Sequence, residues 1–155
     1  MKYIFVSTNN TCRSFMAEAV MKQKIEEAGL DSVIDICSRG LIVLFEEPVH
    51  AGAAEIVRSH GYTDADFTSA PLVQEEITND TIIITMTEDQ KKKVIENYEG
   101  FLEVATIYEY AGEVGDIKDP YGKSEEEYEC CFLQIKQLVD KIWKTKYLNH
   151  RREKI

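Results

Sequence analysis

The sequence predicts an α/β fold, a parallel sheet with helices packed on both of its faces. Four short strand-like apolar runs alternate along the chain with segments of helical periodicity, an order typical of parallel sheets. The run Ile82-Ile83-Ile84 is apolar at every position and therefore suits a central strand that is covered on both sides. The expected strands are residues 3–6, 33–36, 81–86 and 102–108.

Helix signals lie between these strands, at residues 16–28, 49–59 and 88–98, and a long helix closes the chain. Pro48 suits the first position of the second helix. The stretches that begin at Thr87 and Ser124 have the form of capping boxes. One apolar stripe of the last helix is expected to face the core, namely Tyr128, Cys131, Phe132, Ile135, Leu138, Val139 and Ile142.

Length and composition predict one ordinary globular domain over residues 1–155, with 44% hydrophobic and 30% charged residues. No apolar run reaches the length of a membrane span, and no signal peptide is expected before the first strand. The four cysteines are Cys12, Cys37, Cys130 and Cys131. They fit no disulfide framework of a small secreted domain, which favours a reducing, cytoplasmic location.

The net charge of −10 is distributed unevenly. Residues 141–155 carry six Lys and Arg against one Glu, so the acidic charge lies in the preceding part of the chain. An acidic body argues against a nucleic-acid partner. The basic end fits a helix C-terminus followed by a frayed tail at residues 148–155.

The stretch from Ser7 to Arg13 follows the first strand and precedes the first helix, a position that favours an anion site. Helix-start N–H groups lack intrahelical partners, and a loop of this length can curl its amides inward. Arg13 adds a planar guanidinium that can donate to two phosphate oxygens. The glycine-lysine pattern of a nucleotide-binding loop is absent, so phosphate, sulfate or a phosphorylated side chain is expected rather than a triphosphate.

The loop sequence VSTNNTCRS, residues 6–14, resembles the Cys-x5-Arg-Ser/Thr signature of low-molecular-weight protein tyrosine phosphatases. Asp119-Pro120-Tyr121 is similar to the family's late Asp-Pro-aromatic signature, and Ser38-Arg39-Gly40 to its Ser-Ala-Gly. Thr85-Met86-Thr87 falls where the family's third strand ends. The resemblance covers nearly the whole chain and implies a four-stranded parallel sheet in the order 2-1-3-4, with the phosphate loop after strand 1.

The resemblance also implies the chemistry of the site. Residue 7 is the nucleophile position, and Asp119 protonates the leaving group and later accepts a proton from the hydrolytic water. Arg13 binds the phosphoryl oxygens together with the loop amides. The implied phosphate-binding residues are Thr8, Asn9, Asn10, Thr11, Cys12 and Arg13. The expected partner is a phosphorylated protein or peptide, and neither a cofactor nor a metal is expected.

Further positions are expected to support the site. By the same resemblance, Ser14 donates a hydrogen bond toward the nucleophile, Asn10 and Ser38 prop the loop, and Tyr121 lines the slot for the phosphorylated side chain. Asn9 and Phe15 replace the usual glycine and proline, and Asn9 tolerates a positive φ where the loop needs one. Residues 65–72 lack the family's usual basic residue.

Ser7 is the gravest departure from the pattern. A cysteine at a helix N-terminus can have its pKa lowered from ~8.5 to ~3.5, which makes it a ready thiolate, whereas a serine hydroxyl stays protonated. The histidines lie outside both signatures, so His50 and His60 are expected to be surface or partly buried residues and His150 to belong to the tail. The chain is therefore expected to bind phosphate and to turn over hardly at all.

Two explanations of Ser7 stand side by side. An engineered exchange is favoured because Arg13 and Asp119 are both retained, and a natural pseudophosphatase that binds phosphorylated proteins is the alternative. Arsenate reduction on the same fold is disfavoured because residues 80–100 hold no cysteine relay. Thr11, together with the Asp-Pro-Tyr-Gly-Lys-Ser string that begins at Asp119, is similar to the bacterial protein-arginine phosphatase branch, so both phosphotyrosine and phosphoarginine remain candidate substrates.

Overall fold

The computed structural model describes residues 1–63 and 67–148, and its centre is a four-stranded parallel sheet in the order β2-β1-β3-β4. The fold class and the strand order expected from the sequence are both confirmed. The strands are β1 (Lys2–Ser7), β2 (Asp35–Gly40), β3 (Thr81–Thr85) and β4 (Glu103–Thr106). A basic tail is expected at residues 148–155, and all of it after Leu148 lies outside the described residues.

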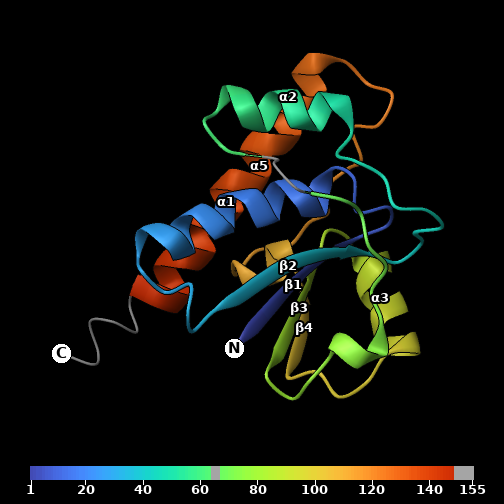
Figure 1. Ribbon diagram of the computed structural model, residues 1–155, viewed down its shortest axis with the longest axis vertical. Helices are drawn as coiled ribbons and strands as arrows, with labels where there is room; N and C mark the ends of the chain where they lie inside the picture. Colours follow the sequence, from blue (N-terminus) through green and yellow to red (C-terminus); the bar gives the residue numbers. More distant parts are fainter. Residues whose placement is uncertain (64–66, 149–155) are drawn as a thin grey trace.

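Helices cover both faces of the sheet (Figure 1). They are α1 (Arg13–Glu27), α2 (Ala51–Ser59), α3 (Glu88–Asn97), α4 (Ile107–Tyr110) and α5 (Glu125–Trp143), with a 3-10 turn η1 (Gln74–Glu76) and a π-helical turn η2 (Lys144–Leu148). Figure 1 shows α1 and α5 on one face with α2 packed beyond them, and α3 on the opposite face. Among the described residues, no helix is long and apolar enough to cross a membrane.

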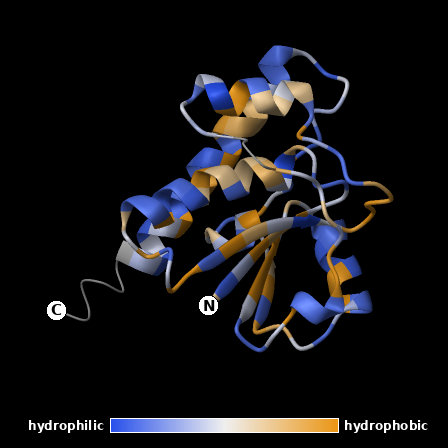
Figure 2. Ribbon diagram, viewed as in Figure 1, coloured by the Kyte–Doolittle hydropathy of each residue, from blue (hydrophilic) through white to orange (hydrophobic). Residues whose placement is uncertain are grey.

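Two hydrophobic cores lie on the two faces of the sheet. Alternate residues of β1 and β3 point to opposite sides: Phe5 and Ile84 join the large core beneath α1 and α5, whereas Ile4 and Ile83 join the smaller core beneath α3. Figure 2 shows the hydrophobic colouring of the central strands. The stripe of α5 that the sequence predicts is buried at every position, so its assignment to the core is confirmed.

β2 begins and ends later than the sequence indicates, at Asp35 instead of residue 33 and at Gly40 instead of residue 36. Val33 is exposed and precedes the strand, and the polar residues that follow continue the ladder because β1 supplies a partner for each of them as far as Ser7 opposite Gly40. An edge strand needs no apolar alternation where its neighbour provides the hydrogen bonds. This register brings Gly40 beside the loop that follows β1.

Three other boundaries differ from expectation. β4 ends at Thr106, because Thr106 and Glu109 form a capping box that starts α4. α2 begins at Ala51 with His50 as its N-cap, so Pro48 lies ahead of the helix. Ser124 accepts a hydrogen bond from the Glu127 N–H but receives no reciprocal bond, and its box is therefore only half formed.

Candidate active site

Backbone hydrogen bonds from neighbouring segments hold the loop between β1 and α1. Three of the loop carbonyls accept hydrogen bonds of 2.9–3.0 Å from backbone N–H groups: Ser7 from Leu41, Thr8 from Ile42, and Thr11 from His50. The first N–H groups of α1, which starts at Arg13, add their unpaired donors. Unpaired N–H groups at the start of a helix are donors that can bind an anion, and we call this loop with its N–H groups the cradle.

Asn10 stabilises the loop through its backbone conformation and its side-chain hydrogen bonds. Its backbone has φ 60°, so the loop needs a positive φ here, whereas Asn9, which could also tolerate one, does not adopt it. Its side-chain Oδ1 accepts from the Ala70 N–H at 3.0 Å, and its Nδ2 donates to Ser14 Oγ at 2.9 Å. Asparagine suits this position because it tolerates the left-handed conformation and offers both a donor and an acceptor.

Ser7 lies at the base of the cradle and is only 2% exposed. Its Oγ is 2.6 Å from Ser14 Oγ and accepts the Asn10 backbone N–H at 3.2 Å. Ser14 Oγ accepts a hydrogen bond from Asn10, and the Ser14 hydroxyl can donate to an anionic atom at position 7. Two donors thus converge on the atom at position 7, an arrangement that stabilises an anionic nucleophile.

Arg13 and Asp119 meet above this base. The Arg13 guanidinium is buried and donates to the Ile117 carbonyl at 2.8 Å. Its other terminal nitrogen lies 3.8 Å from Asp119 Oδ2, and Asp119 Oδ1 accepts the Tyr121 N–H at 3.1 Å. The Asp119 side chain is 42% exposed and lines the same pocket as the loop, so its carboxyl is open to solvent beside Arg13.

One pocket contains the loop and the acid together, and it is lined by Ser7, Asn9, Asn10, Thr11, Cys12, Arg13, His50, Asp119, Tyr121 and Tyr128. Its mouth is aromatic: the His50 and Tyr121 rings meet edge to face with centroids 4.9 Å apart, and His50 Nδ1 lies 3.4 Å from the Tyr128 hydroxyl. In the described part of the chain, no group of three or more His, Cys, Asp or Glu is arranged to hold a metal ion.

Helix α3 and strand β2 also contact the loop. Gln90 of α3 donates to Thr8 Oγ1 at 3.1 Å, while its Oε1 accepts the backbone N–H groups of Met86 and Thr87. Gly40 approaches the loop so closely that a Cβ there would lie 3.0 Å from the backbone of Thr8 and Asn9. Only a glycine fits this contact without displacing the loop.

The expected Asn10–Ser38 pair is not formed. Ser38 lies buried on β2, but the Asn10 side chain bonds to Ala70 and Ser14 instead. Among the other residues singled out by the sequence, Tyr121 and all the loop residues except Thr8 line the pocket, and Thr8 anchors the loop to Gln90.

Sequence reasoning missed three contributors to the site. His50 was expected outside it, yet its backbone bonds to Thr11 and its ring lines the mouth. Tyr128 was assigned to the core and is buried, but it also faces the pocket, where Gly52 leaves room for its ring. Gln90 was read as half of a capping box and also bonds to the loop. The local pattern carries no signal for these contacts, since each joins segments far apart in the sequence.

Comparison with known proteins places this site in a family. The family model of low molecular weight phosphotyrosine protein phosphatase matches residues 2–153. The low molecular weight protein-tyrosine-phosphatase PtpB of Staphylococcus haemolyticus is 33% identical over 142 residues, 92% of this chain and 97% of that protein. The chain therefore belongs to the low-molecular-weight protein tyrosine phosphatase family.

Solved structures agree with this assignment. The low molecular weight protein tyrosine phosphatase from T. tengcongensis superposes with a TM-score of 0.86 at 29% identity, over 93% of this chain and 98% of that one. YwlE arginine phosphatase, solved as a cysteine-to-serine mutant with a phosphorylated active-site serine, superposes with a TM-score of 0.83 at 29% identity, over 96% of this chain and 99% of that one. The similarity thus extends to both the tyrosine and the arginine phosphatases of the family.

Proposed function

We propose that this chain binds the phosphoryl group of a phosphorylated protein in the cradle after β1, and that Ser7 holds the nucleophile position in a form that hardly turns over. The observation that carries the proposal is the pair of donors on Ser7 Oγ, from Asn10 and Ser14, beneath the Arg13 guanidinium and the Asp119 carboxyl. This is the apparatus that a thiolate nucleophile uses. An oxygen there keeps its proton and is both a weaker nucleophile and a poorer leaving group.

The division of labour follows from the geometry. Arg13 and the loop amides neutralise the phosphoryl oxygens, which suits a loose transition state that depends on positioning and charge. Asp119 at the pocket mouth protonates the departing atom and then activates the water that attacks the phospho-enzyme. Ser14 and Asn10 hold the nucleophile. No step requires a metal or a cofactor.

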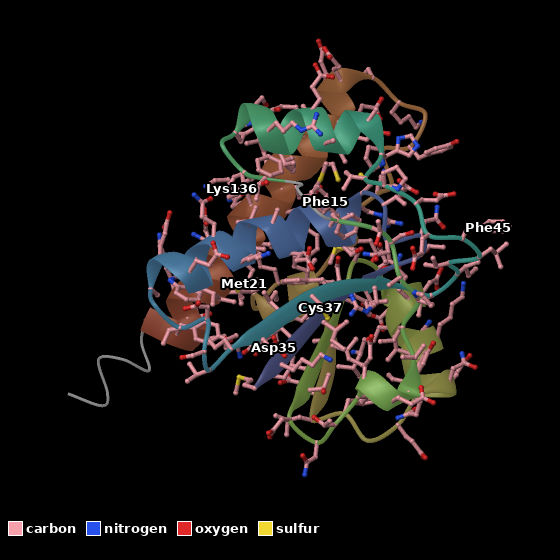
Figure 3. The ribbon with its side chains drawn as sticks, in the orientation of Figure 1. Phe15, Met21, Asp35, Cys37, Phe45 and Lys136 are labelled. Atoms are coloured by element: carbon pink, nitrogen blue, oxygen red, sulfur yellow. The ribbon has the colours of Figure 1, made fainter. Side chains whose placement is uncertain are left out.

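The surroundings of the pocket favour a polypeptide substrate. The loop after β2 carries three exposed apolar side chains, Ile42, Leu44 and Phe45, and Phe45 projects from the edge of the molecule in Figure 3. Ile42, Leu44 and Phe45 line a shallow depression that Asn9 connects with the phosphate loop. Such residues can contact the chain that carries the phosphorylated side chain. The four free thiols support a cytoplasmic setting for this encounter.

Thr11 bears on which phosphorylated amino acid, phosphotyrosine or phosphoarginine, the pocket accepts. It is buried in the loop wall at 7% exposure, and its residue lines the pocket. A hydroxyl there can polarise the water that attacks a phospho-enzyme formed from a P–N bond, while the fold is as similar to a tyrosine phosphatase as to YwlE arginine phosphatase, at 29% identity each. Phosphoarginine is therefore tested beside phosphotyrosine.

A second candidate function is a stoichiometric phosphoryl acceptor or phosphoprotein-binding module. The phosphorylated active-site serine in the YwlE mutant structure favours it. In such a step the Ser7 O–P bond forms as the P–O or P–N bond of the substrate breaks, and the Ser7 proton reaches the leaving group through Asp119. The phosphoserine then persists because an alkoxide leaves far less readily than a thiolate.

The deciding experiment is Ser7→Cys. Because the other catalytic groups are in place, this variant should hydrolyse an aryl phosphate and a phosphotyrosine or phosphoarginine peptide, measured by phosphate release. Adding Asp119→Asn should lower the rate by ~10²–10⁴-fold, with a smaller loss for leaving groups that need no proton. The unmodified chain, incubated with the same peptides and weighed by mass spectrometry, reports any phosphoryl group retained on Ser7.

Each result separates the two functions. Release by Ser7→Cys supports a phosphatase whose nucleophile is altered in this chain, and the preferred peptide names the branch. A Ser7→Cys variant that binds phosphate and stays inert would contradict the enzyme and leave the binding module standing. Retention of a phosphoryl group by the unmodified chain would support the acceptor.

A further inference from the structure

Two cysteines from different elements lie together beneath the phosphate pocket. Cys12 is the N-cap of α1, and Cys131 lies on the buried stripe of α5. They are 8% and 5% exposed and belong to the same hydrophobic core. Their thiols lie close enough for each to shift the pKa of the other. Helices α1 and α5 pack together along much of their length, so this pair joins two elements that are already in contact.

The charges around the pair favour reaction between the two sulfurs. The interaction between the two thiols raises the pKa of Cys12, with burial acting in the same sense, and lowers the pKa of Cys131. The Arg13 guanidinium lowers the pKa of both thiols. Cys131 Sγ also lies 3.9 Å from the Lys118 carbonyl, one residue ahead of the acid Asp119. The pair therefore adjoins both parts of the pocket, because Cys12 belongs to the loop and Cys131 contacts the segment that carries Asp119.

A small oxidant can reach the pair through the pocket, because Cys12 is one of the pocket-lining residues. Position 7 carries an oxygen, so the partner thiol for Cys12 is Cys131. The remaining cysteines lie elsewhere: Cys37 packs on the small core beneath α3, and Cys130 is exposed beside Glu55 and Glu129. Cys130 is adjacent to Cys131 in sequence but faces a different surface, which makes it a natural control.

We propose that Cys12 and Cys131 form an intramolecular disulfide when a hydroperoxide enters the pocket. The Cys12 sulfur attacks one peroxide oxygen as the Cys12 proton passes to the other; the O–O bond breaks, an S–O bond forms, and the departing oxygen leaves as water. Cys131 then attacks the sulfenic sulfur, the S–O bond breaks, the S–S bond forms, and the Cys131 proton leaves with the hydroxyl as a second water. Two thiols lose two electrons, and the peroxide gains them.

The disulfide would alter anion binding at the loop. An S–S bond of ~2.05 Å is much shorter than the separation of two thiols that are not bonded, so Cys12 and Cys131 must move toward each other. Cys12 lies between the loop and the first turn of α1, and its own N–H is one of the cradle donors. We expect phosphate affinity to fall by at least tenfold in the oxidised chain.

The test treats the full chain and its Cys130→Ser variant with hydrogen peroxide, blocks residual thiols, and maps peptides without reduction. The expected product in both is one cross-link between the peptides of Cys12 and Cys131, formed more slowly at a phosphate concentration that saturates the loop by calorimetry. Cys131→Ala and Cys12→Ser should yield none. The Cys130→Ser chain retains both core cysteines, so the main result does not depend on a core variant.

Several outcomes would overturn the proposal. A cross-link that disappears in Cys130→Ser, or oxidation of Cys12 to sulfinic acid without a cross-link, would exclude the disulfide. Both thiols staying reduced while Cys37 or Cys130 is oxidised would do the same. Equal rates with and without saturating phosphate would exclude entry through the pocket. Phosphate affinity is read separately on the reduced chain, so a failure of the proposed phosphate site is distinguishable from a failure of the disulfide.

Discussion

At the scale of single residues, the site depends on which atom accepts hydrogen bonds at position 7 and on how the groups that donate those hydrogen bonds are positioned. Asn10 adopts a left-handed backbone conformation in the loop and donates a hydrogen bond to Ser14. The Ser14 hydroxyl is in turn hydrogen-bonded to Ser7. Arg13 is in turn fixed by the Ile117 carbonyl. The donors are thus oriented before any anion arrives, which is the arrangement that makes electrostatic stabilisation effective.

The Asn10 substitutions separate its two contributions. Asn10→Ala removes two side-chain hydrogen bonds and replaces asparagine at φ 60° with a residue that tolerates this conformation less well, so the free energy of unfolding should fall by ~2–4 kcal/mol. Asn10→Gly accepts the conformation and loses only the hydrogen bonds, so it should retain ~1 kcal/mol more. Urea denaturation measures both. Equal stability of the two variants would mean that the conformation carries no cost.

Arg13 should dominate anion affinity. Arg13→Ala removes the guanidinium and should lower phosphate affinity by ~100-fold or more, because hydrogen bonds to charged groups contribute ~1.5–3 kcal/mol each. Arg13→Lys keeps the charge without the planar guanidinium, so its phosphate affinity should lie between those of the unmodified chain and Arg13→Ala. Titration calorimetry with phosphate reads the affinity, and circular dichroism confirms the fold. Unchanged binding in Arg13→Ala would remove Arg13 from this role.

At the scale of elements, the loop is held where β1, β2 and α3 converge. β2 contributes Gly40, whose missing Cβ lets its backbone lie against the loop, and α3 contributes Gln90. On the other face, α1 and α5 are joined by their apolar stripes and by one polar contact, in which Asp140 of α5 lies between Lys24 of α1 and Lys136 of its own helix. This contact lies in the last turn of α1, at the end of the helix opposite the loop.

Asp140 makes the α1–α5 contact sensitive to pH. Burial works to raise the pKa of its carboxyl, but the ammonium groups of Lys24 and Lys136 outweigh it and hold the pKa below its usual value. A lowered folded-state pKa stabilises the fold above the unfolded-state value of ~3.9, and this stability is lost as the pH falls through the folded-state value. Asp140→Asn should therefore cost ~0.5–1 kcal/mol at pH 7.

Urea denaturation of Asp140→Asn across pH tests this sign. The difference from the unmodified chain should be full at pH 7 and should shrink below pH ~4. Glu113→Gln is a matched control, because Glu113 pairs with Lys141 at 3.0 Å on an exposed surface and should cost less. A difference for Asp140→Asn that stays constant down to pH ~2 would contradict the role of its charge.

At the scale of the whole molecule, one sheet separates two cores of unequal size. Ile83 is fully buried on the α3 side, and the single tryptophan, Trp143, packs on the opposite side at the end of α5. Both cores share the backbone of β1 and β3, so the loss of either should unfold the sheet that supports the other. The site at the carboxyl edge of β1 then depends on both.

Ile83→Ala tests this coupling. Removal of a buried isoleucine side chain should lower the free energy of unfolding by ~2–5 kcal/mol. Because the two cores unfold together, Trp143 fluorescence and far-ultraviolet circular dichroism should shift by the same amount in denaturant. Ile84→Ala, its neighbour on the other face, is the matched control and should behave alike. Fluorescence that is unaffected by Ile83→Ala would show that the two cores unfold independently.

The sequence by itself determined the alternating elements and the core stripe of α5, because these depend on local periodicity, and a contiguous motif predicts the members of the phosphate loop. Tertiary structure alone decided the end of β2 at Gly40, the bonding of Asn10 to Ala70, the entry of His50 and Tyr128 into the pocket, and the meeting of Cys12 with Cys131. Each of these joins residues that are distant along the chain. Such contacts follow from how the strands register and the helices pack, and one sequence read locally holds no record of that arrangement.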